Sequence, residues 1–126
     1  MTAALTQEQN TIHFLNRVSF GATQEEIRKA ARVGISAYLE EQLHPERIPD
    51  SLVQEKLAGL KTVRLSSKDL FELYPPPSQA KAKGAAVSSR MEGPRYVIFE
   101  LQQARLLRAV YSQRQLYEII VDFWSN

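Results

Sequence analysis

The sequence predicts an all-α protein, arranged as an irregular bundle of about six helices. Apolar residues recur at spacings of three and four along most of the 126 residues. Patterns that cap helix ends recur between these stretches. The hydrophobic share of 44% and the charged share of 24% are those of an ordinary globular chain. Together these observations predict one folded helical segment with a modest core.

An N-terminal helical cluster is predicted over residues 1–73. Its first helix begins near Thr6 and ends near Ser19, with apolar residues along one face. The spacing of Thr23 and Glu26 predicts a capping box, in which each side chain satisfies a backbone N–H of the other residue. A second helix is therefore expected directly after this pair.

Shorter helices follow within the same cluster. Gly34 is expected to end the second helix, and Ser36 to cap a third helix that closes before Pro45. Asp50 and Ser67 are predicted to cap two further short helices, the last ending near residue 73.

Residues 74–93 are predicted to form a flexible segment. Three consecutive prolines, Pro75 to Pro77, favour an extended polyproline conformation. The residues after them are rich in Ala, Ser, Lys and Gly and show no periodicity. A stiff connector is the favoured interpretation, and a ligand for an aromatic-lined groove is the alternative.

A helical hairpin is predicted over residues 94–126. Its first helix begins at Pro94, where a missing N–H costs nothing, and runs to Tyr111. Ser112 and Gln115 have the spacing of another capping box, which would open the last helix. The buried stripe of the longer helix is predicted to comprise Tyr96, Phe99, Leu106, Leu107 and Val110.

The last helix is apolar over an unusually wide arc of roughly 200°, whereas a helix packed on one side needs about 100°. The residues that form this arc are Leu116, Tyr117, Ile119, Ile120, Val121, Phe123 and Trp124. We therefore expect the chain to be the N-terminal segment of a larger protein, whose missing C-terminal part covers the helix. Self-association through this helix is expected in the isolated segment.

Composition narrows the classes of partner and site. The chain contains no cysteine, which excludes disulfides, thiolate metal sites and a cysteine nucleophile within it. A net charge of +2 gives no reason to expect a nucleic-acid partner. No stretch is apolar enough for a membrane span, and no secretory signal is recognisable at the start. A cytoplasmic location is thus the default expectation.

Two stretches, residues 13–23 and 104–126, resemble the bacterial family called domain of unknown function 1800. The likeness lies in a helix that carries His13 and Arg17 and is followed by Phe-Gly, and in a later helix that ends Phe-Trp-Ser-Asn. The resemblance implies a mostly helical architecture and several hundred further residues, which begin with His-Phe. It implies no activity. Many relatives look exported, which stands against the cytoplasmic default.

The candidate polar site consists of His13, Arg17, Asp122 and Asn126. His13 and Arg17 are four residues apart and so lie side by side on the first helix. With the histidine that the family pattern places after Asn126, His13 and Asp122 would supply ligands for a divalent metal. The alternative is that these side chains only brace neighbouring loops. Trp124 beside Asn126 is a candidate sugar platform, and core packing is its alternative.

Two functions stay open at this stage. The segment is expected to act as a scaffold or packing module for the missing C-terminal part. Alternatively, it is part of a metal-dependent enzyme acting on an extracellular polymer, with its site completed by absent residues. The sequence assigns neither a catalytic residue nor a cofactor.

Overall fold

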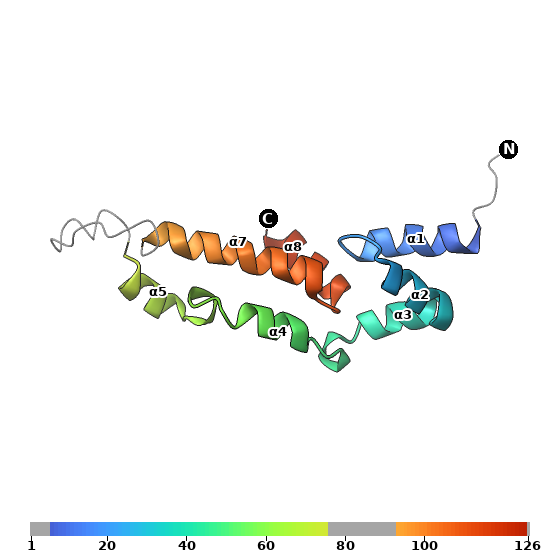
Figure 1. The fold of residues 1–126 in the computed structure, drawn as a ribbon, viewed down its shortest axis with the longest axis horizontal. Helices are drawn as coiled ribbons and strands as arrows, with labels where there is room; N and C mark the ends of the chain where they lie inside the picture. Colours follow the sequence, from blue (N-terminus) through green and yellow to red (C-terminus); the bar gives the residue numbers. More distant parts are fainter. Residues whose placement is uncertain (1–5, 76–92, 126) are drawn as a thin grey trace. The chain divides into compact units, whose positions relative to one another are not determined.

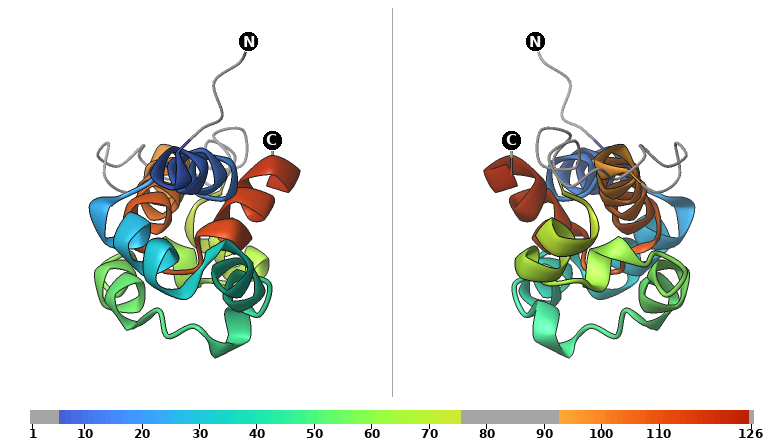
Figure 2. Two further views of the ribbon diagram at one scale, coloured as in Figure 1. Left: turned by 90° about the vertical axis from the view of Figure 1, so that its right-hand side faces the viewer. Right: turned by 90° about the vertical axis from the view of Figure 1, so that its left-hand side faces the viewer.

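The computed structural model describes residues 6–75 and 93–125, and within these ranges every regular element is a helix. The two views in Figure 2, turned from that of Figure 1, show these helices and the turns between them. The predicted all-α fold is confirmed. The elements are α1 (Gln7–Val18), α2 (Gln24–Val33), α3 (Ile35–Gln42), η1 (Pro45–Arg47), α4 (Ser51–Leu57), η2 (Thr62–Arg64), α5 (Ser67–Leu73), α7 (Pro94–Tyr111) and α8 (Gln115–Ser125).

Contacts group the chain into two compact units. The first unit combines Met1–Ser51 with Ala109–Asn126, and the second unit is Leu52–Arg108. The predicted division into residues 1–73, 74–93 and 94–126 cannot be compared with these units directly. It divides the sequence into consecutive segments, whereas the units group residues by contact. It stays a prediction, and residues 76–92 of the predicted flexible segment lie outside the described residues.

Several helix ends fall where local patterns predict them. The predicted capping box of α2 is present, with the N–H of Glu26 donating to Thr23 Oγ1 and the N–H of Thr23 donating to Glu26 Oε2. Thr6 caps α1 in the same way. Gly34 ends α2 with a φ of +89°, a conformation that costs little only for glycine. These ends are fixed by residues within a few positions of one another.

Two predicted caps are wrong by one or two residues. Gly34, and not Ser36, precedes α3, since the backbone already turns into the helix at Ile35. Ser66, and not Ser67, caps α5, because its hydroxyl accepts from the N–H of Asp69 while the Asp69 carboxylate accepts from the N–H of Ser66. At α5 the neighbouring Ser66 makes the predicted kind of cap, whereas Gly34 precedes α3 without any side-chain hydrogen bond.

The first unit has a small core between α1, α2 and α3. Leu15, Ala30 and Tyr38 are its fully buried members. The rings of Phe14 and Tyr38 meet edge to face, with centroids 6.2 Å apart and planes at 86°. This arrangement sets the positive edge of one ring against the negative face of the other.

The second unit has a separate aliphatic core. Val53 and Leu57 of α4 pack with Leu60 and with Ala104 of α7. Ala104 has no exposed surface. Its short side chain allows a neighbouring backbone to approach α7 closely at this position.

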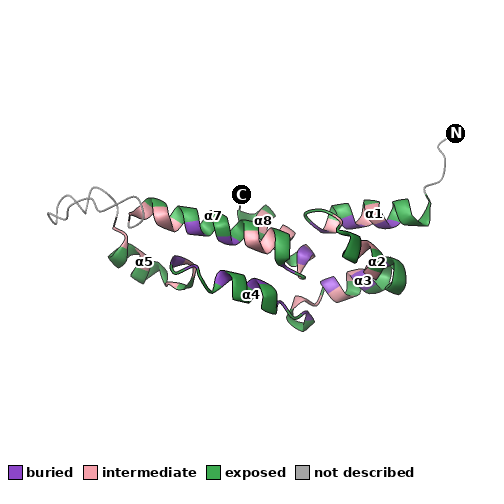
Figure 3. Cartoon of the chain, in the orientation of Figure 1, coloured by how far each residue is buried: buried purple, intermediate pink, exposed green. Residues whose placement is uncertain are grey.

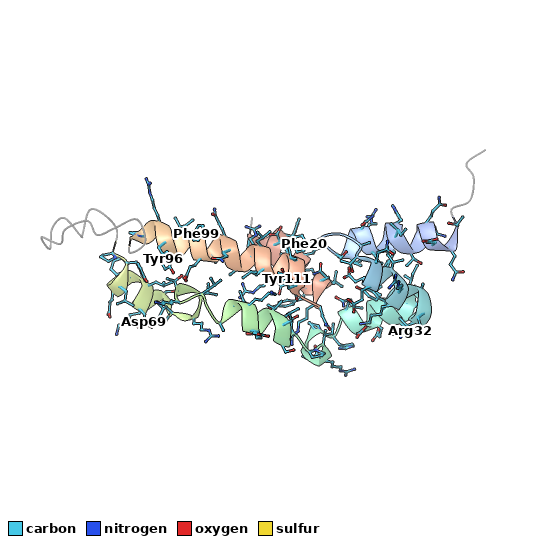
Figure 4. All side chains as sticks on the ribbon, in the orientation of Figure 1. Phe20, Arg32, Asp69, Tyr96, Phe99 and Tyr111 are labelled. Atoms are coloured by element: carbon cyan, nitrogen blue, oxygen red, sulfur yellow. The ribbon has the colours of Figure 1, made fainter. Side chains whose placement is uncertain are left out.

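The predicted buried stripe of α7 is largely wrong. Phe99, Leu106 and Val110 are 60%, 65% and 59% exposed, whereas Glu100 is 2% exposed and Ala104 is fully covered. Figure 3 shows buried positions as narrow bands on a mostly exposed α7, and Figure 4 labels Phe99 on its first turns. Because α7 is apolar on several sides, the periodicity of its sequence does not determine which side is covered.

Candidate functional site

Helix α8 is covered on its polar side and exposed on its apolar side. Gln115 is buried, and Glu118 and Asp122 are partly covered. The exposed residues include Phe123, at 71%, and Trp124, at 80%. We define the α8 face as the five large exposed apolar residues of this helix: Tyr117, Ile120, Val121, Phe123 and Trp124.

The side chain of Gln115 fastens the first turn of α8. Its Oε1 accepts from the N–H of Phe20 at 3.1 Å, and its Nε2 donates to the carbonyls of Ser112 at 2.7 Å and Ala109 at 3.1 Å. The capping box predicted for Ser112 and Gln115 is therefore wrong. Ser112 Oγ instead accepts from the N–H of Arg114 at 3.0 Å, and the side-chain amide of Gln115 makes the three contacts just described.

Two further buried side chains hold the same turn. Gln42 Nε2 donates to the carbonyl of Gln113 at 3.0 Å, and its Oε1 accepts from the N–H of Leu116 at 3.2 Å. The Asp50 carboxylate accepts from Ser112 Oγ and from the N–H of Gln113, each at 2.9 Å. Gln42 thereby satisfies a first-turn N–H that has no partner inside the helix.

We call Gln42, Asp50 and Gln115 the α8 clamp. All three are buried, and they join the start of α8 to α3 and to the loops after α1 and before α4. Sequence reasoning did not identify the clamp, because Gln42 lies 71 residues from Gln113 and no local pattern marks such a pair. The clamp fixes the first turn while the later turns present the α8 face.

The predicted polar site is only partly placed by the structure. His13 and Arg17 are exposed on α1, and Asp122 is half-buried on α8. These two helices contact each other within the first unit. Among the residues that the structure describes, no group of three or more His, Cys, Asp or Glu side chains is placed to hold a metal ion. Asn126 lies outside the described residues, and the metal site stays a prediction.

Trp124, the predicted aromatic platform, contacts a second ring. Trp124 meets Phe123 edge to face, with ring centroids 5.4 Å apart and planes at 82°. Sequence reasoning named Trp124 alone, although adjacent aromatic residues at an exposed helix end were a signal for such a pair. A sugar-binding role for Trp124 stays a prediction.

The second unit contains a buried carboxylate that sequence reasoning also missed. Glu100 Oε2 accepts from the N–H of Thr62 at 2.6 Å and from Thr62 Oγ1 at 2.7 Å, and its Oε1 accepts from the N–H of Lys61 at 3.2 Å. Burial by itself raises the pKa of Glu100, but hydrogen bonds from Tyr96, Thr62 and Lys61 outweigh it and lower the pKa. Both oxygens of the Glu100 carboxylate accept these hydrogen bonds, so the role of the carboxylate is to join η2 to α7.

The helices that the structure describes include none long and apolar enough to cross a membrane.

Comparison with known proteins gives one match. The family described as "Protein of unknown function (DUF1800)" matches residues 13–126. No curated protein and no solved structure matches the chain. The match includes both stretches on which the family resemblance was recognised.

Proposed function

The chain belongs to the DUF1800 family, and we propose that it serves there as a helical packing module for a further, C-terminal part of a longer protein. The α8 face is the observation that carries this proposal. Five large apolar side chains on one short helix are exposed, and two of them expose more than two thirds of their surface. Exposed apolar groups gathered on one face are typical of surfaces that bind protein.

The clamp supports the same function. A helix that docks on a partner loses less entropy when it is already formed and oriented. Gln42, Asp50 and Gln115 hold the first turn of α8 by hydrogen bonds that do not involve the apolar side chains. The face is thus left free for a partner, while the helix that carries it is ordered beforehand.

The gain from covering the face is large for a segment of this size. Burying Phe123 and Trp124 would contribute about 2 kcal/mol each, from the apolar area removed from water. Val110, which belongs to the same unit as α8, is a further exposed apolar side chain of that unit.

Cysteine labelling tests the proposal, because the chain has no cysteine of its own. Phe123→Cys would be labelled with a maleimide in the 126-residue chain, alone and with the remaining polypeptide of the longer protein added in trans. We expect the remainder to slow labelling by roughly tenfold or more, because docking covers the α8 face. Submicromolar chain concentrations keep self-association out of the measurement.

Lys68→Cys on α5 is the matched control, since the Lys68 side chain is 82% exposed and lies in the other unit. Its labelling rate should stay within about twofold of its value without the added remainder. Equal labelling of Phe123→Cys with and without the remainder would contradict the proposed function.

A further inference from the structure

We propose that, in the 126-residue chain, the α8 face pairs with the same face of a second copy, so that two antiparallel α8 helices form a two-fold dimer. The inference rests on the proposed function, since both require that this face binds an apolar protein surface. It adds a definite occupant for the face when no other partner is present. In a two-fold dimer both copies use the same patch, so each contact from residue i of one copy to residue j of the other is repeated in reverse.

The charge distribution of α8 makes its face self-complementary. The five residues of the face carry no charge. The charged residues of the helix, Glu118 and Asp122, lie on the partly covered side, toward the rest of the first unit. Two copies can therefore approach without like charges meeting, and the three aromatic residues are of the types that contribute most at interfaces.

The area of the face is sufficient for a weak dimer. An aromatic side chain offers about 200 Å², so the exposed parts of Tyr117, Phe123 and Trp124 amount to roughly 400 Å² per copy. With Ile120 and Val121 the face reaches roughly 500 Å², and a pair would bury about 1,000 Å², near the lower limit for a specific interface. We therefore expect reversible pairing in the micromolar range.

The antiparallel orientation follows from the clamp. The clamp joins the first turn of α8 to α3 and to two loops, so these elements lie beside that end of the helix. Parallel pairing would bring both of these ends together. Antiparallel pairing separates them, and it sets Phe123 and Trp124 of one copy near Tyr117 and Ile120 of the other.

The exposed stripe of α7 is less suited to self-pairing. Arg95 lies four residues before Phe99 and so next to it on the helix surface. A parallel pair joined through this stripe would bring equal positive charges together, which opposes that orientation. Leu106, 65% exposed on α7, is therefore a suitable position for a control variant.

Sedimentation velocity on the intact chain tests the pairing over roughly 1 to 100 µM, the range in which a weak dimer dissociates. We expect the mean mass to rise from monomer toward dimer with concentration. Phe123→Lys places two positive charges at the interface and should raise the dissociation constant about tenfold or more. Leu106→Lys introduces the same charge on α7 and should leave the constant within about twofold.

Three results would overturn the proposal: a monomer at every concentration, a dimer that survives Phe123→Lys, or equal weakening by Leu106→Lys. Far-UV circular dichroism checks that the variants keep their helices, and Trp124→Lys replaces Phe123→Lys if that variant loses them. Failure of the dimer leaves the labelling of Phe123→Cys unaffected. Failure of the proposed function appears only in that labelling experiment, so the two outcomes are distinct.

Discussion

Each of the two units buries an ionisable side chain whose pKa is shifted, Glu100 in one and Tyr38 in the other, and the two side chains differ in charge at neutral pH. In the second unit, Glu100 is 2% exposed and is ionised at neutral pH, with its pKa lowered. In the first unit, Tyr38 is also 2% exposed and is neutral at this pH, and burial and the neighbouring Glu26 carboxylate raise its pKa further above neutrality.

The difference shows how surroundings reinforce the charge state that each group already has at neutral pH. The Glu100 carboxylate is met by donors from Lys61 and Thr62, which favour the charged form more than burial opposes it. Tyr38 packs edge to face on Phe14, and its hydroxyl lies 3.4 Å from Glu26 Oε1, a long distance for a hydrogen bond. Both units thus combine an apolar core with hydrogen bonds to a buried carboxylate, Asp50 in the first and Glu100 in the second, and the first unit also buries a neutral phenol.

The largest effect on local stability is expected from Glu100→Ala in the second unit. The change leaves the buried hydroxyl and N–H of Thr62 without an acceptor, and hydrogen bonds to charged groups are the costly ones to lose. We expect about 3 kcal/mol less protection of the Lys61 and Thr62 amides in hydrogen exchange. Gln103→Ala, at an exposed position of α7, should change this protection by less than about 0.5 kcal/mol. Equal losses in both variants would show that Glu100 does not hold η2.

A smaller effect is expected from Gln115→Ala in the first unit. This variant removes the acceptor for the N–H of Phe20 and the donor to two carbonyls, at a cost of about 2 kcal/mol in the protection of α8 amides. Gln113→Ala is the matched control, because only the backbone of Gln113 makes the contacts in the clamp. Its effect should be within about 0.5 kcal/mol. A loss from Gln113→Ala as large as that from Gln115→Ala would contradict the assignment of the clamp to side chains.

Titration is expected to have the smallest effects on stability near neutral pH. The second unit should lose stability at acid pH, and the first unit should lose stability at alkaline pH. The lowered pKa of Glu100 contributes stability that is present above about pH 4.3, the unfolded value, and is lost as the pH falls through the folded value. The raised pKa of Tyr38 contributes stability that is present below about pH 10 and is lost as the pH rises above it. Hydrogen exchange below and above neutral pH measures the two losses separately. The amides of Lys61 and Thr62 report the acid loss, and those of α1–α3 report the alkaline loss.

Tyr38→Phe identifies the source of the alkaline loss. Phenylalanine keeps the ring packing on Phe14 and has no group to ionise, so α1–α3 should keep their protection above about pH 10. The acid loss at Thr62 should be unchanged in this variant. An alkaline loss of the same size in Tyr38→Phe would assign it to another group.

The sequence by itself determined the helical class and many of the helix ends. The capping box of Thr23 and Glu26, the start of α7 at Pro94 and the end of α2 at Gly34 were all predicted. Each depends on residues within about four positions of one another, so the local sequence contains the whole cause. The one- or two-residue error at Ser36 and Ser67 arose where neighbouring residues competed for the same end.

Only the tertiary structure decided which side of each helix is covered. For α7 the choice of Ala104 and Glu100 over Phe99 depends on residues from α4 and η2, about 40 to 50 positions away (the Thr62–Glu100 separation is 38). The clamp depends on Gln42 and Asp50, more than 60 positions before the turn that they hold. Periodicity indicates a side only when a helix is apolar on one side, and α7 and α8 are apolar on more than one. Their covered sides are therefore fixed by the partners that pack on them, and these are set by the fold.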